Sequence, residues 1–167
     1  LISLVLGYGC KSGSVCDNRP EWVISDLGTL GIRGVVVPLY ATSSKQQLKY
    51  IADESKMKLI FVGNREQYDK ATWLLGNSKT LKMIIVFDPG IAPDNDCCLD
   101  WRKFINLDSE NLLVTEMNQR MREIQPDDLV TIIYTSGTTG ESKGAMLTHA
   151  RFMSAFRIHD ERIDVSD

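Results

Sequence analysis

Short hydrophobic runs recur along the chain and are separated by longer segments of mixed character. The runs are rich in Val and Ile and do not alternate with polar residues, which is typical of strands that are covered on both faces of a sheet. Four such strands are predicted, at residues 35–37, 59–62, 83–87 and 129–134. Between the third and the fourth, residues 88–108 are expected to form a loop region, because turn residues dominate them.

The segments between the runs carry helical patterns. Helices are predicted at residues 19–32, 43–55, 65–77 and 109–124. In the second of them, Leu48, Ile51 and Ala52 form an apolar stripe, and Ser43 or Ser44 is suited to its N-cap. The alternation of strand and helix predicts an α/β fold with a mostly parallel, doubly wound sheet and helices on both faces.

Length, composition and charge are typical of a globular domain and argue against a nucleic-acid-binding or membrane-spanning protein. At 167 residues the chain has the length of one domain, and 43% hydrophobic with 25% charged residues is an ordinary globular mixture. The net charge of −3 argues against a nucleic-acid surface. No apolar run reaches the ~18–20 residues that cross a bilayer, and the opening LISLVLGYG lacks the basic flank and cleavage site of a signal peptide. Because the first residue is not Met, the chain is expected to begin inside a longer protein.

Four cysteines and two histidines provide little material for a metal site. Cys10, Cys16, Cys97 and Cys98 form no C-x-x-C pair. Reduced thiols in a cytoplasmic protein are the expected state, and no metal-ligating residues are assigned. A zinc or disulfide role for the adjacent Cys97 and Cys98, in or beside a surface loop, remains an unsupported alternative.

The stretch TIIYTSGTTGESKG, residues 131–144, carries the strongest chemical signal. It follows a predicted buried strand, and a helix is predicted after it, at residues 145–156. The residues of interest are Thr135, Ser136, Gly137, Thr138, Thr139, Gly140, Lys143 and Gly144. Glycines let an anion approach the main chain closely, hydroxyl groups add donors, and a lysine adds positive charge. This combination predicts a binding loop for phosphate groups.

Two familiar phosphate motifs do not fit this stretch. A Walker A loop needs Gly before its lysine and Ser or Thr after it, whereas Ser142 precedes Lys143 and Gly144 follows it. The dinucleotide pattern G-x-G-x-x-G is absent too. A plain Gly/Thr turn with a solvated lysine remains the alternative.

The segment YTSGTTGESKG resembles the phosphate-binding signature of the adenylate-forming superfamily, Y-T-S-G-T-T-G-x-P-K-G. The resemblance implies that residues 135–140 hold the β- and γ-phosphates of ATP, together with Lys143 as the catalytic residue. Ser142 replaces the usual Pro, which removes neither a charge nor a donor. Arg151 replaces the usual Asn of a Thr-His-x-Asn stretch, so a role for that position is not carried over.

Two further stretches resemble long-chain fatty acyl-CoA synthetases. They are DNRPEW, residues 17–22, and VVVPLYATSS, residues 35–44. The first is interpreted as architecture, with Pro20 in a first helical turn and Asn18 or Asp17 as the cap. Where the family has a Gly-Asp-x-Val strand, the region before Val15 looks shortened, so a trimmed first strand is expected.

The resemblance implies a ligase that activates a long-chain fatty acid with ATP and transfers it to coenzyme A, releasing AMP and pyrophosphate. ATP, Mg²⁺ and coenzyme A are the implied cofactors and co-substrates, in a cytoplasmic protein with possible peripheral membrane contact. Residues 1–167 would form part of the large N-terminal domain and end just after the phosphate loop. Because the family's adenine, ribose, acyl and coenzyme A sites come later, this chain alone is predicted to be inactive. An amino-acid- or aryl-acid-activating enzyme and a non-catalytic binding domain of the same fold stay open as alternatives.

Overall fold

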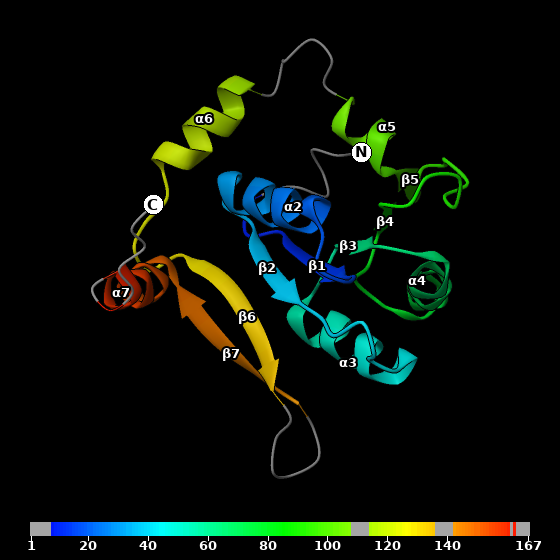
Figure 1. Cartoon of the computed structure of the whole chain (residues 1–167), viewed down its shortest axis with the longest axis horizontal. Helices are drawn as coiled ribbons and strands as arrows, with labels where there is room; N and C mark the ends of the chain where they lie inside the picture. The colour runs from blue at the N-terminus through cyan, green and yellow to red at the C-terminus, as the bar shows by residue number, and fades with distance from the viewer. Residues whose placement is uncertain (1–7, 108–113, 136–141, 161, 163–167) are drawn as a thin grey trace.

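A seven-stranded sheet forms the centre of the computed structural model, which describes residues 8–107, 114–135, 142–160 and 162 (Figure 1). In chain order its strands are β1 (Lys11–Val15), β2 (Val35–Pro38), β3 (Leu59–Val62), β4 (Met83–Val86), β5 (Cys98–Asp100), β6 (Leu129–Thr135) and β7 (Lys143–Thr148). Their order across the sheet is β5-β4-β3-β1-β2-β6-β7. All neighbours are parallel except β6 and β7, which are antiparallel. The mostly parallel sheet is confirmed, with one antiparallel edge strand that the sequence did not indicate.

Helices cover both faces of this sheet. The helices described are α2 (Pro20–Gly31), α3 (Lys45–Ser55), α4 (Arg65–Asn77), α5 (Trp101–Ile105), α6 (Val114–Arg122) and α7 (His149–Asp160), of which α6 buries no residue. Within β3, Ile60 and Val62 pack in one core cluster with side chains of α3 and α4, whereas Phe61 packs with Trp22 of α2 and Trp101 of α5 in another. Successive residues of a strand point to opposite faces, so a continuous hydrophobic run is buried on both sides.

The first strand is neither trimmed nor poorly formed. β1 has five residues and lies in the middle of the sheet between β2 and β3. Its short side chains, Ser12, Gly13 and Ser14, give little hydrophobic signal. A Cβ added to Gly13 would lie 2.5 Å from the Cε of the buried Met57, so the end of that side chain would have to move.

Residues 88–108 contain more structure than the expected loop region. β5 extends the sheet at its far edge, and α5 follows it directly. Cys98 is buried within β5, whereas the adjacent Cys97 is exposed. The buried Trp101 packs edge-on against Phe61 and Phe87, so it is a core residue.

The helix starts follow the expected capping chemistry in one case and depart from it in another. Ser44 forms a capping box with Gln47: its Oγ accepts the Gln47 N–H at 3.2 Å, and Gln47 Oε1 accepts the Ser44 N–H at 2.9 Å. Pro20 is the first residue of α2, as expected. The N-cap there is Arg19, however, and it makes no side-chain cap bond, so the prediction of Asn18 or Asp17 was wrong.

Replacing the capping serine tests how much this local bond contributes. Ser44→Ala is expected to lower the free energy of unfolding by about 1 kcal/mol, because the Gln47 N–H loses its side-chain acceptor. Urea unfolding followed by far-UV circular dichroism measures the change. Gln46→Ala, at an exposed position in the same turn, should leave stability nearly unchanged. An equal loss in both variants would contradict the capping role.

Candidate functional site

The β6–β7 hairpin brings the two ends of the predicted phosphate loop together. Thr135, the last residue of β6, is paired with Lys143, the first residue of β7, and both are exposed. Ser136, Gly137, Thr138, Thr139 and Gly140 lie outside the described residues. Within the described part of the chain Lys143 makes no ion pair, so its ammonium group is available to an anion.

The segment after the loop is a strand, which corrects the helix predicted at residues 145–156. Ala145, Met146 and Leu147 pair with β6, and α7 begins only at His149. The His149 N–H donates to the carbonyl of Asp128 at 3.0 Å, beside the start of β6 and therefore at the opposite end of the hairpin from Lys143. The positive end of the α7 dipole cannot contribute to phosphate binding there, because the dipole acts only over a helix's first turn.

Gly144 is needed for a close approach between side chain and main chain. It is paired with Tyr134, and a Cβ at this position would lie 2.7 Å from Ile132 Cγ2 and 3.0 Å from Tyr134 Cζ. The backbone of Gly144 is not in the left-handed region. This position therefore does not need glycine for a left-handed backbone. The absence of a side chain at Gly144 instead lets the buried Tyr134 ring lie across β7.

A methyl group at this position should disturb that packing. Gly144→Ala is expected to cost about 1 kcal/mol of unfolding free energy, because Tyr134 or Ile132 must move. Thermal unfolding and near-UV circular dichroism, which reports on tyrosine packing, measure the effect. Gly76→Ala is the matched control: no atom lies near the added carbon, and alanine in a helix should stabilise the protein. Unchanged stability in Gly144→Ala would contradict the close-approach role.

A groove of about 310 Å³ lies beside the hairpin at the carboxyl ends of β1 and β2. The chain passes from β1 to α2 on one face of the sheet and from β2 to α3 on the other, so neighbouring loops diverge there. Such switch points are where ligands bind in open α/β sheets. The groove, called the switch-point groove below, is lined by Ser14, Cys16, Asn18, Trp22, Pro38, Leu39, Tyr40, Ala41, Ile133 and Tyr134.

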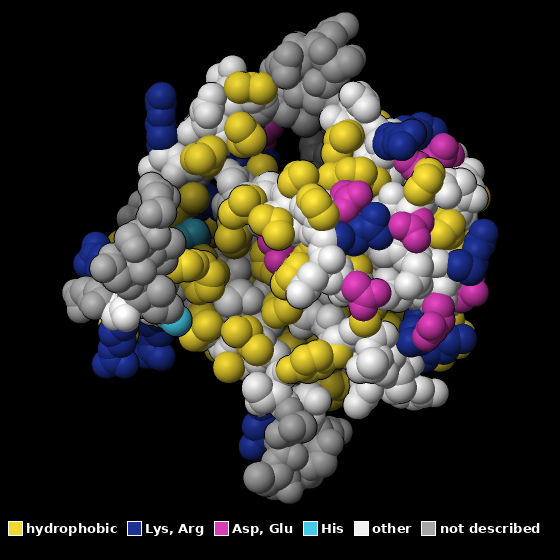
Figure 2. Space-filling model, viewed as in Figure 1, with side chains coloured by type: hydrophobic (Ala, Val, Ile, Leu, Met, Phe, Trp, Pro, Cys, Tyr) yellow, Lys and Arg dark blue, Asp and Glu magenta, His cyan; other side chains and the backbone are white. Residues whose placement is uncertain are grey.

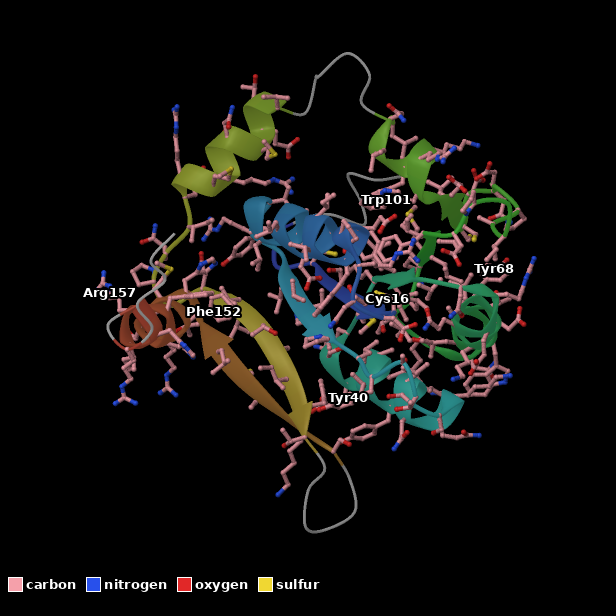
Figure 3. All side chains as sticks on the ribbon, in the orientation of Figure 1. Cys16, Tyr40, Tyr68, Trp101, Phe152 and Arg157 are labelled. Carbon is pink, nitrogen blue, oxygen red and sulfur yellow. The ribbon has the colours of Figure 1, made fainter. Side chains whose placement is uncertain are left out.

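Aromatic side chains shape this groove. Tyr40 is 72% exposed and lies between α3 and the end of the hairpin that carries the loop (Figure 3).

Burial raises the pKa of the Cys16 thiol to about 11, so the thiol is neutral at physiological pH. No charged side chain lines the groove among the residues described. An apolar or neutral part of a ligand fits it. Lys143 is not one of its lining residues; it lies on β7 opposite Thr135, the residue after the groove-lining Tyr134.

The two stretches that resemble long-chain fatty acyl-CoA synthetases, of which DNRPEW was interpreted as architecture, contribute both to the framework and to the groove. Arg19 bridges Glu21 at 2.9 Å and Asp88 at 2.9 Å, which ties the start of α2 to the end of β4. Trp22 and Tyr40, in contrast, line the switch-point groove. The position of each stretch, directly after a parallel strand, was the signal that could have indicated this.

Two kinds of feature are absent from the part of the chain that the structure describes. No group of three or more His, Cys, Asp or Glu side chains there is arranged to hold a metal ion. None of the helices described combines the length and hydrophobicity that a bilayer span requires.

The chain is similar in sequence to known proteins. The family model described as AMP-binding enzyme matches residues 4–166. Fatty acyl-CoA synthetase A of Dictyostelium discoideum is 34% identical over 158 residues, covering 92% of this chain and 23% of that protein. Long-chain-fatty-acid–CoA ligase 5 of Rattus norvegicus is 36% identical over 152 residues, covering 85% of this chain and 21% of that protein.

Solved structures show the same fold. The anthranilate CoA ligase AuaEII, in complex with anthranoyl-AMP, superposes with a TM-score of 0.73 at 19% identity, covering 96% of this chain and 29% of that one. Coronafacic acid ligase from Pectobacterium brasiliense gives a TM-score of 0.71 at 17% identity, covering 95% and 28%. The chain thus spans about a fifth of the length of the two curated relatives described above. Because the family model matches nearly the whole length of this chain, the chain belongs to the AMP-binding enzyme family.

Proposed function

We propose that this chain is part of an AMP-forming long-chain fatty acid–CoA ligase and that its β6–β7 loop binds the phosphates of ATP. The observation that carries the proposal is the pairing of Thr135 with Lys143 at the end of the hairpin, next to the switch-point groove. The names of the relatives support the substrate class: several are fatty acyl-CoA synthetases or long-chain-fatty-acid–CoA ligases. No observation on the described residues favours an amino acid or aryl acid instead.

In the proposed reaction, a fatty-acid carboxylate attacks the α-phosphorus of ATP and displaces pyrophosphate, and the thiol of coenzyme A then displaces AMP from the acyl-adenylate. The Lys143 ammonium group stabilises negative charge that develops on the leaving pyrophosphate. Hydroxyl and N–H groups of residues 135–140 hold the same oxygens. Mg²⁺, which prefers phosphate oxygens, accompanies ATP as part of the substrate.

The proposal places the ligase in the cytoplasm, in fatty-acid metabolism. All four cysteines are unpaired, which is the usual state of thiols in a reducing compartment. Partners are proposed to be the small molecules ATP, fatty acid and coenzyme A.

Fatty-acid-dependent exchange of labelled pyrophosphate into ATP tests the proposal. A product of the same reading frame that extends to the length of the relatives should catalyse exchange with a long-chain fatty acid. The 167-residue chain alone should remain at background, because it holds only a phosphate loop. Exchange that depends on an amino acid or an aryl acid, and not on a fatty acid, would favour the alternative enzyme class. Exchange by the short chain alone would contradict the assignment of a partial site.

A further inference from the structure

An apolar groove of about 370 Å³ lies between α2 and α7, next to the switch-point groove, with which it shares Trp22, Pro38 and Ile133. We call it the α2–α7 groove. Its walls carry Val23 and Leu27 of α2, Ile133 of β6, and Phe152 and Phe156 of α7, with Asp26 among them. Figure 2 shows hydrophobic side chains gathered over α2 and the neighbouring β6, whereas Asp and Glu side chains lie mostly to the right of the view. Figure 3 places Phe152 on the side of α7 nearer to β6.

These apolar side chains are unusually open to solvent. Leu27 is 63% exposed, Val23 52% and Phe156 51%. Single exposed apolar residues are common on proteins, but a contiguous group of them marks an interaction surface. α7 also exposes Met153 and Ile158, and a helix that is hydrophobic on several sides is normally buried. The side chains of the α2–α7 groove are therefore typical of a surface that packs against another segment of polypeptide.

Asp26 specifies part of the chemistry of that layer. This half-buried carboxyl accepts hydrogen bonds from Ser14 Oγ, at 3.2 Å, and from the Trp22 side chain. Within the described residues it makes no ion pair, and the neighbouring titratable side chain of Cys16 is neutral at physiological pH. A carboxylate between apolar walls is unfavourable unless a cation or further donors reach it. A covering segment should thus combine apolar side chains with one positive group.

The length of the relatives indicates where such a segment comes from. This chain spans 23% of the Dictyostelium synthetase and 29% of the AuaEII chain, so proteins of this family contain several times as much polypeptide. We propose that, in the full-length protein, a segment of the same polypeptide outside this sequence fills the α2–α7 groove and sets a Lys or Arg side chain against Asp26. The inference rests on the family assignment and not on the proposed reaction, so its test uses no activity measurement.

Thiol labelling tests whether the groove is covered. Leu27→Cys places a reactive group in the groove, and the native Cys97, exposed in the β4–β5 connection, is an internal reference. Mass spectrometry gives the maleimide labelling rate at each of the two positions. The labelling rate at position 27, divided by the rate at Cys97, should be at least about tenfold lower in the longer product of the reading frame than in the 167-residue chain.

A second variant and three contrary outcomes keep this test decisive. Val23→Cys serves the same purpose if Leu27→Cys fails to fold, because Val23 lines the same groove and is also exposed. Equal ratios in the short and long proteins would overturn the proposal. Protection that appears only when lipid vesicles are added, or a reading frame that stops after Asp167, would overturn it too.

Asp26→Asn tests the positive group, because the sign of its effect depends on the partner. In the 167-residue chain at about pH 7.5 the variant should raise the thermal midpoint, since it removes an uncompensated charge. In the longer product it should lower the midpoint by about 2–4 °C, because a buried cation would lose its counter-charge. Asp69→Asn, on the exposed side of α4, should leave both midpoints unchanged. An upward shift in both proteins would contradict the ion pair.

Discussion

Lys143→Ala is expected to lower kcat/KM of the proposed adenylation step about 10²–10³-fold in the full-length protein. Removing one preorganised positive group from a site where charge develops has an effect of this order, equivalent to about 3–4 kcal/mol. Stability should be unaffected, because Lys143 is exposed and makes no ion pair within the described residues. Fatty-acid-dependent release of pyrophosphate, measured as ATP is varied, separates the effect on kcat from the effect on KM.

Two further variants make this prediction specific. Lys143→Arg keeps the charge but changes the donor geometry, and is expected to recover part of the loss. Lys82→Ala removes an exposed lysine just before β4, at the amino ends of the parallel strands, and should leave kinetics unchanged. If Lys143→Ala changed neither the KM for ATP nor turnover, the β6–β7 loop would not be the phosphate site.

Asp26→Asn is expected to raise the free energy of unfolding of the 167-residue chain by about 2 kcal/mol at about pH 7.5. Burial raises the pKa of this carboxyl to about 6, although hydrogen bonds from Ser14 and Trp22 oppose the shift. The difference from an ordinary aspartate corresponds to roughly 3 kcal/mol, and solvent that reaches a half-buried group reduces this to about 2. Asparagine keeps an acceptor oxygen for both donors. Urea unfolding of the variant and of Asp69→Asn gives the comparison.

The pH dependence follows from the direction of that shift. Between about pH 4 and pH 6 the folded protein binds a proton at Asp26 that the unfolded chain has released, so stability from this group falls as the pH rises. Above about pH 6 this contribution to stability is fully lost. The free energy of unfolding of Asp26→Asn should then be higher than that of the natural protein by a constant amount. Below about pH 4 both states are protonated and the difference should vanish. A difference that stays constant from about pH 4 to about pH 8 would contradict the raised pKa.

Other carboxylates titrate in the same acidic range, but their effect on stability is the same in the natural protein and in Asp26→Asn. Asp53, for example, has a pKa lowered to about 2: burial acts to raise it, but hydrogen bonds from Lys49, Ser78 and the Lys79 N–H outweigh that effect. Its contribution is lost only in strong acid, and it is the same in the natural protein and in Asp26→Asn. The difference between the two proteins therefore reports on Asp26.

The amino-acid sequence alone determined the strands that carry a continuous hydrophobic run and the helices between them. Ile60, Phe61 and Val62 are apolar at every position because both faces of β3 are buried, and that pattern is readable without coordinates. Capping of α3 by Ser43 or Ser44 was likewise predicted from the sequence, because the bonds involved are local, and the structure selects Ser44. Phosphate binding by the 135–143 loop was also predicted from residue types, since it needs glycines, hydroxyl groups and a cation close together in sequence, and it stays a prediction.

Only the tertiary structure decided the parts that depend on contacts distant in sequence. β1 carries little hydrophobic signal, yet it lies in the middle of the sheet because it pairs with β2 and β3, and its Gly13 leaves room for the side chain of Met57, far along the chain. Residues 145–148 suit a helix locally, but pairing with β6 makes them a strand, since the hydrogen bonds of a hairpin outweigh a weak local preference. The switch-point groove and the α2–α7 groove combine side chains from three or more elements, and no local pattern encodes which elements meet.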